Sequence, residues 1–270
     1  AAEQGDNFAS FQLGKMYVDG RGVARLTLNR PDKHNSLNAQ MIADLRAALM
    51  QIDGDDKVRV VVLSGEGKSF CAGGDLGWMK EQVESDRAGR IAQATELATM
   101  LKELDELTKP VIARVNGQAY GGGIGIMAVC DIVIAVQDAR FALTETKLGL
   151  IPATIGPFIA ARMGERAVRQ VALNASSFDG HEAQGLGLVS KAVPASELDE
   201  ATDKQINLFL ECAPGAVTNT KAWMIELARN PGHNYQSASA ERLADRWEES
   251  ETEEGLACFF DRSKPSWQRD

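Results

Sequence analysis

Two glycine-rich stretches contain the groups best suited to chemistry in this sequence. Residues 118–125 read QAYGGGIG, and residues 69–76 read SFCAGGDL. Glycine inside a regular element costs roughly 0.5–1 kcal/mol relative to alanine, so clustered glycines among apolar residues indicate that the backbone itself must be bare. Main-chain N–H groups at the start of a helix have no partner within the helix and bind negative charge. The two stretches therefore predict a site whose active groups are amides.

Taken together, the two stretches predict an oxyanion hole. If they end adjacent strands, each can donate one N–H to the same oxygen, such as a carbonyl oxygen that becomes enolate-like. Each donor would contribute about 3 kcal/mol of transition-state stabilisation. Either stretch alone is equally well explained as a tight loop that binds nothing.

Three better-known glycine motifs are each excluded by one residue. A phosphate-binding loop ending in GKS would need glycine where Val62 stands, and a dinucleotide-binding loop would need glycine where Ile126 stands. A nucleophile elbow would need serine at Ala119. None of the three histidines lies beside a candidate nucleophile, so no catalytic triad is predicted.

The elements that would position these stretches alternate between strands and helices. A hairpin is predicted with its turn at 19–22, strands at 58–63, 109–115 and 131–136, and helices at about 41–52, at 91–107 and from near Gly122. This alternation predicts an α/β fold with partly parallel sheets. Beyond about Pro157 the apolar spacing is mostly helical, so the C-terminal third is expected to be mainly helical.

Composition narrows the classes of partner. The chain has 270 residues, with 29 basic and 38 acidic side chains and a net charge of −9, which argues against nucleic acid as a partner. The four cysteines are too widely spaced for a metal site and are expected to be free thiols in a reducing compartment. No apolar run approaches the roughly 18 residues of a membrane span, and the first ten residues lack a signal-peptide pattern. A cytoplasmic protein without membrane contact is expected.

The sequence also resembles a known superfamily. Residues 29–38 (NRPDKHNSLN), 68–76, 109–135 and 141–152 (FALTETKLGLIP) are similar, in this order, to the crotonase or enoyl-CoA hydratase/isomerase superfamily. The resemblance implies an α/β, crotonase-like spiral of ββα units with a C-terminal helical trimerisation region. Residues 1–200 would form the core with the acyl-CoA site, and residues 201–270 the trimerisation region. The implied assembly is a homotrimer or a dimer of trimers, and the implied ligand is a coenzyme A thioester, with no separate cofactor.

The resemblance assigns roles to individual residues. The amides of Gly74 and Gly122 would hold the thioester oxygen, and Glu145 would be the leading proton-transfer residue, with a surface carboxylate as the alternative. Hydratases of the superfamily commonly have a second glutamate at the position of Gly125. Its absence here leaves a double-bond isomerase open, and it also suggests space for a branched or bulky acyl group.

The surroundings of Glu145 suggest a modified acidity. A carboxylate among Leu143, Leu148 and Leu150 would have its pKa raised by desolvation, which suits a group that gives and takes protons near neutrality.

The finer resemblance suggests a substrate. Residues 71–80 and 143–158 are most similar to bacterial hydratases of 3-methylglutaconyl-CoA and isohexenylglutaconyl-CoA, in leucine and acyclic-terpene catabolism. The expected activity is therefore hydration of a branched, carboxylated enoyl-CoA. An enoyl-CoA isomerase and a noncatalytic acyl-CoA or RNA binding module are the alternatives.

Coenzyme A contacts are implied at four further residues. Backbone near Ser36 and Ala72 would meet the adenine, and Phe259 and Arg262 would reach the nucleotide of a neighbouring subunit. Phe259 is equally well explained by helix packing. A carboxylate at the far end of the substrate would need a cation, for which the candidates are Lys80, Arg114, Arg140 and Lys147.

Overall fold

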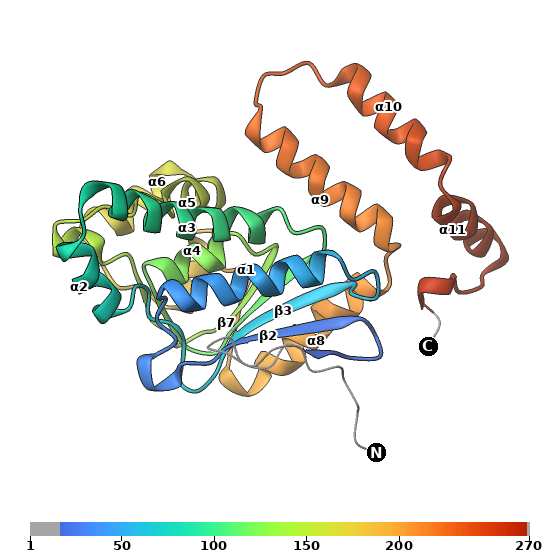
Figure 1. Cartoon of the computed structure of the whole chain (residues 1–270). Coiled ribbons are helices and arrows are strands. Elements are labelled where there is room, and N and C mark those ends of the chain that lie inside the picture. Colours follow the sequence, from blue (N-terminus) through green and yellow to red (C-terminus); the bar gives the residue numbers. More distant parts are fainter. Residues whose placement is uncertain (1–16, 269–270) are drawn as a thin grey trace.

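The computed structural model describes residues 17–268, which form two sheets with helices around them (Figure 1). The larger sheet has the strand order β1-β2-β3-β5-β7-β9 and is parallel except for the β1–β2 pair. Its strands are β1 (Tyr17–Val18), β2 (Val23–Leu28), β3 (Val60–Gly65), β5 (Val111–Val115), β7 (Ile132–Val136) and β9 (Lys191–Val193). The smaller sheet is parallel throughout and consists of β4 (Ser69–Cys71), β6 (Gln118–Tyr120) and β8 (Phe141–Ala142).

The order of the elements confirms the predicted spiral of ββα units. Each of β3, β5 and β7 is followed by one short strand of the smaller sheet and then by helices, which return the chain to the larger sheet. These helices are α2 (Leu76–Glu84), α3 (Arg87–Asp105), α4 (Gly122–Ala128), α5 (Gly156–Met163), α6 (Glu165–Ala172) and α7 (Gly180–Gly185), whereas α1 (Ala39–Asp53) lies between β2 and β3. Short 3₁₀ helices are η1 (Pro31–Lys33), η2 (Glu145–Leu148), η3 (Ala195–Glu197) and η4 (Ser266–Gln268).

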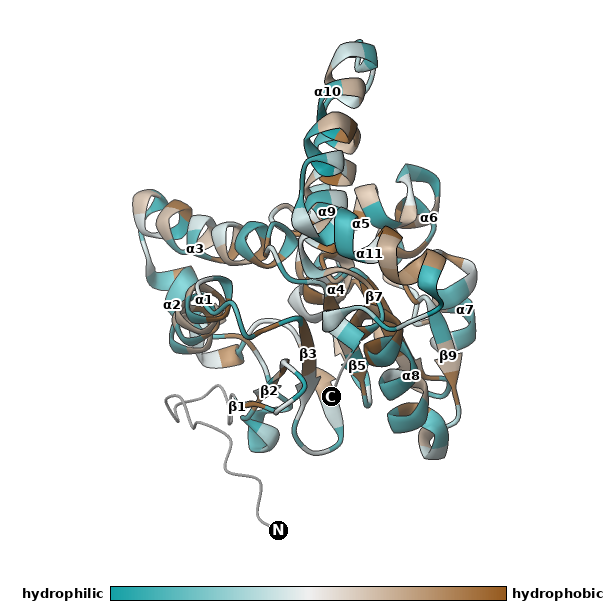
Figure 2. Cartoon of the chain, turned by 90° about the vertical axis from the view of Figure 1, so that its right-hand side faces the viewer, coloured by the Kyte–Doolittle hydropathy of each residue, from teal (hydrophilic) through white to brown (hydrophobic). Residues whose placement is uncertain are grey.

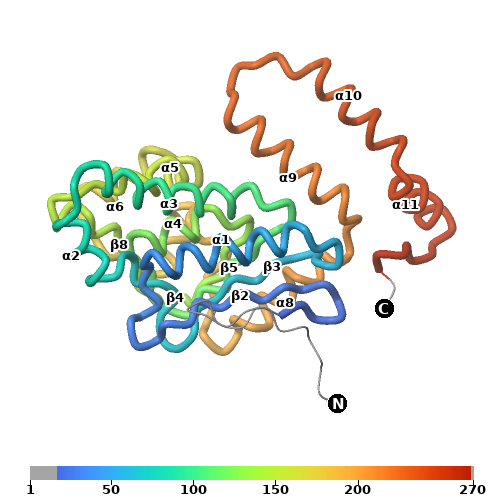
Figure 3. The backbone as a smooth tube through the Cα atoms, viewed as in Figure 1, coloured from blue at the N-terminus to red at the C-terminus, as the bar shows by residue number. Residues whose placement is uncertain are grey.

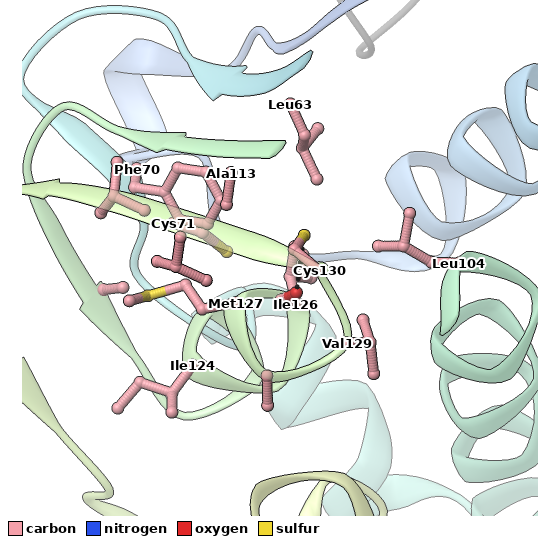
Figure 4. Packing of buried hydrophobic residues seen from close by; sticks show 14 of the residues in the cluster. Leu63, Phe70, Cys71, Leu104, Ala113, Ile124, Ile126, Met127, Val129 and Cys130 are labelled. Carbon is pink, nitrogen blue, oxygen red and sulfur yellow. Dashed lines mark hydrogen bonds between the residues drawn. The ribbon is translucent and has the colours of Figure 1, made fainter. Parts of the chain in front are cut away.

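Successive side chains of a strand point to opposite faces of the larger sheet, and this divides the core into two clusters. Val61 and Leu63 point to the face covered by α1, α3 and α4, whereas Val60 and Val62 point to the face covered by α8 (Leu198–Leu210). Figure 4 shows the first cluster at the point where α4 packs on the strands, with Phe70 and Cys71 of β4 against Ile124 and Met127. The core is therefore built around α4, the short helix that begins in the glycine run.

Several sequence-based predictions are confirmed, and others need correction. The six apolar residues of the helix at 41–52 are all buried in α1, whose first turn is capped by the Asn38 side chain. The hairpin turn is present, but the start of its first strand lies outside the described residues. The helix expected at 91–107 is present as α3 but begins earlier, at Arg87, and Ile91 is half exposed on it. Strands β4, β6, β8 and β9 and helix α2 were not predicted, because two or three residues of strand carry no readable alternation.

The last three long helices leave the body of the protein. We call α9 (Pro214–Arg229), α10 (Gln236–Trp247) and α11 (Ser250–Asp261) the C-terminal arm; Figures 1 and 3 show it extending to one side of the sheets. The domain boundary expected at residue 200 falls inside α8, whose Leu198 and Ile206 belong to the second core cluster. The division of the chain into a core and a trimerisation region stays a prediction.

One arginine joins both ends of the arm to the body. The Arg59 guanidinium donates to the carbonyls of Leu210, at 3.0 Å, and Cys212, at 2.8 Å, just before α9. It also donates to the Trp267 carbonyl, after α11, at 2.7 Å. Among residues 17–268 there is no helix long and apolar enough to cross a membrane.

Candidate active site

The turn after β4 is held by one parallel bridge to Leu37. The Leu37 N–H donates to the Gly73 carbonyl at 2.7 Å, and the Asp75 N–H donates to the Leu37 carbonyl at 2.8 Å. In a parallel bridge the residue between these two, Gly74, turns its own N–H away from Leu37. Within residues 17–268 this N–H has no acceptor, so it is free to bind an oxygen from outside the chain.

An ion pair fixes the same turn from the side. Arg30 donates to Asp75 Oδ2 at 2.9 Å and to the Ser36 carbonyl at 2.7 Å. The other Asp75 oxygen accepts from the N–H groups of Gly77 and Trp78 and so caps α2. Burial alone would raise the pKa of Asp75, but these hydrogen bonds hold it below its usual value. Asp75 therefore stays charged and keeps the turn in place.

A fully buried asparagine completes this support. Asn35 adopts a left-handed backbone conformation, with φ of 56°. Its Oδ1 accepts from the Arg30 N–H at 2.8 Å, and its Nδ2 donates to the carbonyls of Glu66 and Ser69 at 2.9 and 2.8 Å. All of its side-chain groups are satisfied, as a buried amide requires. The segment NRPDKHNSLN thus serves to fix the position of the turn at Gly74.

The glycine run lies directly against this turn, because β4 and β6 are paired neighbours. Gly122 is the first residue of α4, so its N–H has no acceptor within the helix. A Cβ placed on Gly73 would lie 2.8 Å from the Tyr120 carbonyl oxygen and 3.6 Å from the Gly122 nitrogen. The two backbones are therefore in contact only because side chains are missing. We call Gly73, Gly74, Gly121 and Gly122 the amide corner.

Glu145 approaches the amide corner from the next turn of the chain. A Cβ placed on Gly121 would lie only 3.0 Å from Glu145 Oε1, and Gly121 has φ of 45°, which favours glycine. The second carboxylate oxygen, Oε2, is buried and has no hydrogen-bond partner among the described residues. Desolvation raises the pKa of Glu145, against a weaker opposing hydrogen bond from its own backbone. A carboxyl group with an unpartnered oxygen and a raised pKa suits proton transfer.

The apolar surroundings expected for Glu145 are only partly present. Leu143 is buried, but Leu148 and Leu150 are 60% and 52% exposed, so they do not enclose the carboxylate. A Cβ placed on Gly121 would lie 3.0 Å from Oε1, so main chain also lies close to the carboxylate. The expected direction of the pKa shift and its expected cause, desolvation, are confirmed, whereas the expected enclosure by Leu148 and Leu150 is not.

The space expected beside Gly125 is filled by the protein itself. A Cβ placed on Gly125 would lie 2.5 Å from Cγ2 of Ile155 and 3.6 Å from Cδ1 of Leu101. Ile155 is 2% exposed and belongs to the core. The prediction that glycine here opens room for an acyl group is therefore wrong, because an isoleucine occupies that room.

Two of the four residues expected to contact coenzyme A, Ser36 and Ala72, lie beside the amide corner. Ser36 donates its N–H to the Lys33 carbonyl and its hydroxyl to Asp75, and its carbonyl accepts from Arg30, so its polar groups are already used. The Ala72 N–H likewise donates to the carbonyl of His34 at 2.9 Å.

The other two expected contacts lie on the arm. Phe259 is 76% exposed on α11, and Arg262 caps the end of that helix. Figure 1 shows α11 on the opposite side of the molecule from α4. Within one chain, neither residue reaches the amide corner.

The candidate cations differ in their surroundings. Arg114 donates to Asp199 at 2.6 Å and shares the strand face of Ile112, which packs towards α8, so it points away from the amide corner. Lys80, Arg140 and Lys147 are exposed. Of these, Lys147 follows Glu145 by two residues in η2.

The sequence did not reveal the residues whose roles depend on contacts between distant segments of the chain. Gly121 could have been recognised as a partner of Glu145 only by knowing that the two segments meet. Ile155 carried no signal, because an isoleucine in an apolar segment is ordinary. Arg30 and Asn35 lie in a recognised motif, but their hydrogen bonds are visible only in the fold.

Comparisons with known proteins agree with this architecture. Residues 19–270 match the family model described as enoyl-CoA hydratase/isomerase. A putative enoyl-CoA hydratase of Thermus thermophilus is 30% identical, over 92% of this chain and 98% of its own. The 1,2-epoxyphenylacetyl-CoA isomerase of Escherichia coli is 31% identical, over 92% and 95%. The crystal structure of an enoyl-CoA hydratase from Shewanella pealeana superposes with a TM-score of 0.90 at 35% identity, covering 95% of this chain and 96% of the other.

Proposed function

The chain belongs to the enoyl-CoA hydratase/isomerase family, and from this premise we propose that it adds water across the double bond of a branched, carboxylated enoyl-CoA. The substrates we propose are 3-methylglutaconyl-CoA or isohexenylglutaconyl-CoA. The observation that carries the proposal is the buried, unpartnered Oε2 of Glu145 beside a corner whose Gly74 amide has no acceptor within residues 17–268.

The geometry suits addition of water in two proton transfers. The thioester oxygen accepts hydrogen bonds from the amides of Gly74 and Gly122, which stabilise the negative charge that develops on it. Glu145 takes a proton from water while the water oxygen bonds to C3, and the electron pair of the double bond moves towards the thioester oxygen. Glu145 then returns the proton to C2. The product is the 3-hydroxyacyl-CoA, a tertiary alcohol when C3 carries a substituent.

The position of Glu145 supports its use in both transfers. Its pKa is raised by desolvation, so the protonated form costs less than in water, and no charged partner competes for Oε2. A distal carboxylate on the substrate would meet one of the exposed cations, for which Lys147 lies nearest to Glu145 in the chain.

The substrate claim is tested by hydration assays. Purified protein is mixed with 3-methylglutaconyl-CoA, isohexenylglutaconyl-CoA and unbranched crotonyl-CoA, and loss of the conjugated enoyl absorbance is followed. We expect turnover of at least one branched, carboxylated ester above that of crotonyl-CoA. If crotonyl-CoA alone is hydrated, the proposed substrate class is wrong and the proposed reaction stands. If none of the three esters is hydrated, both the substrate class and the reaction are wrong.

A double-bond isomerase is the second candidate, because one carboxylate is enough to move a proton between two carbons. The replacement of the usual second glutamate by Gly125, with Ile155 filling its place, leaves this alternative open. Reaction in ¹⁸O-labelled water separates the two. Label in the product demonstrates hydration, and a product without added oxygen but with a displaced double bond demonstrates isomerisation.

We further propose that the arm assembles the chain into a trimer or a dimer of trimers. Met224, Leu243, Trp247, Phe259 and Phe260 of the arm are each at least 50% exposed. Figure 2 shows apolar segments on these helices away from the body. Apolar surface on this scale marks a protein interface. In such an assembly, Phe259 and Arg262 would contact the coenzyme A of a neighbouring subunit. Light scattering on purified protein tests the number of subunits.

A further inference from the structure

The segment that carries Glu145 is held by few buried side chains. It runs from η2 to α5, and residues 146–151 are all exposed. Leu143 is the buried residue before Glu145, and Ile155 is the first fully buried residue after it. Between them, the Thr146 hydroxyl donates to the Ala172 carbonyl at 3.1 Å. The two buried side chains and this hydrogen bond together fix the placement of the carboxylate.

The segment touches α4 at two points, one helical turn apart. Glu145 lies against Gly121, and Ile155 lies against Gly125. The Gly125 N–H donates to the Gly121 carbonyl at 3.1 Å, so the two glycines stack on the same side of the helix. At both points a single added carbon would be too close, at 3.0 Å from Glu145 Oε1 and 2.5 Å from Ile155 Cγ2. The approach of the segment to α4 is therefore set by two missing side chains.

From this packing we infer that Gly125 and Ile155 form a positioning pair, which sets the distance of Glu145 from the amide corner. The inference rests on the proposed proton transfer by Glu145. Neither residue of the pair needs to touch the substrate. Any group at position 125 displaces Ile155, and with it the segment that holds Glu145 against Gly121.

The inference predicts a loss of turnover that a second substitution repairs. Gly125→Ala moves the segment, and because a misplacement of about 1 Å can cost about 10²-fold, we expect kcat to fall about 10²-fold. KM should change less, because the amides of the corner stay in place. Gly125→Ala combined with Ile155→Ala removes Cγ2 and so makes room for the added methyl, and this double variant should recover roughly tenfold or more of the loss. Gly125→Ala combined with Ile155→Val keeps Cγ2 and should recover little.

The matched control is Gly185→Ala, at the end of α7. A Cβ there meets nothing within 4 Å, so kcat should be unchanged. A lower melting temperature of Gly125→Ala with kcat and KM unchanged would overturn the inference, because the pair would then be structural only. Equal losses of kcat in Gly125→Ala and in its double variant with Ile155→Ala would overturn it as well.

A second readout separates this inference from the proposed hydration. In D₂O, Glu145 should take a proton from C2 of a saturated acyl-CoA and return a deuteron to the same carbon, which NMR detects. This exchange needs the corner and Glu145, but no addition of water. If the wild type exchanges the C2 proton but hydrates no ester, the proposed hydration is wrong. The positioning pair is then tested by the C2 exchange rates of the same variants. If the wild type does neither, both proposals fall.

Discussion

The amide corner and the C-terminal arm use side chains in opposite ways. At the corner, four glycines leave the backbone bare, and hydrogen bonds from Leu37, Arg30 and Asn35 hold the surrounding turns. On the arm, large apolar side chains are present and face solvent, with Cys258 as the buried residue of its helices. Between α9 and α10–α11 lies an open cavity of about 640 Å³. The corner is complete within one chain, whereas the arm has no core of its own.

This difference teaches that catalysis and assembly should respond to different substitutions. Changes at the corner should alter kcat without altering the number of subunits. Changes on the arm should alter assembly and ligand affinity while the chemistry of a correctly bound substrate remains.

The largest effect is expected from Glu145→Gln. Removal of a general acid–base costs typically 10²–10⁴-fold, and because Glu145 serves both proton transfers we expect a loss of about 10³-fold or more in kcat. Light scattering should show the same assembly as in the wild type. Unchanged turnover would show that Glu145 is not the proton-transfer group, whereas acyl-CoA binding by a wild type with no turnover would support the noncatalytic binding module.

The second-largest effect is expected when alanine replaces one glycine of the amide corner, compared with alanine at one glycine between α9 and α10 of the arm. Gly73 and Gly232 both have positive φ, of 84° and 93°, so alanine is strained at either position. At Gly73 the new Cβ would also lie 2.8 Å from the Tyr120 carbonyl oxygen, whereas at Gly232 nothing lies within 4 Å. Gly73→Ala should lower kcat by about 10²-fold by spreading the corner, and Gly232→Ala should leave kcat unchanged. Equal kinetics in the two variants would show that the corner tolerates separation.

A smaller kinetic effect is expected on the arm. Trp247 is 61% exposed, and Trp247→Glu places a charge on the apolar surface that we assign to assembly. The variant should dissociate to smaller species by light scattering, and KM for the acyl-CoA should rise by about tenfold, equivalent to about 1.4 kcal/mol. Gln236→Glu, an exposed polar position on the same helix, is the control and should assemble normally. Intact assembly of Trp247→Glu would place the interface elsewhere.

The smallest effect concerns the stability of the corner as pH changes. The pKa of Glu145 is raised in the folded state, so its ionised form destabilises the fold. The destabilisation is absent below the pKa of the unfolded chain, about 4.3 for glutamate, and is complete above the folded pKa. Glu145→Gln should therefore melt at a higher temperature than the wild type near neutral pH, and the difference should vanish towards pH 4. A constant difference across this range would show that the carboxylate is well solvated.

The sequence predicted those parts of the fold that have long patterns. The six apolar residues of α1 repeat at helical spacing over three turns, and all six are buried, because a helix of this length has only one way to face a core. Strands β5 and β7 were readable as apolar runs before and after the glycine stretch. Strand β4, with three residues, was read as part of a loop, since its pairing with β6 depends on contacts far along the chain.

The candidate site was predictable to the extent that it consists of backbone. The glycines of the two stretches indicate that main-chain N–H groups act at the site. The resemblance to the superfamily identified Glu145 as the carboxylate beside them. The filling of the space at Gly125 was not predictable, because it depends on where Ile155, thirty positions further along the chain, lies after folding. Exposure on the arm was equally hidden, since helices that bury their apolar side against a partner have the same spacing as helices that bury it within one chain.

The three hydrogen bonds of Arg59 hold the two ends of the arm close together. They bring its entry, at Leu210 and Cys212, and its exit, at Trp267, to one guanidinium group. The arm is therefore a segment of the chain whose two ends are adjacent in space. Excision of residues 214–265 would leave two termini that a short glycine linker can join beside β3, and arms from related chains could be inserted at the same joint to reprogramme which subunits combine.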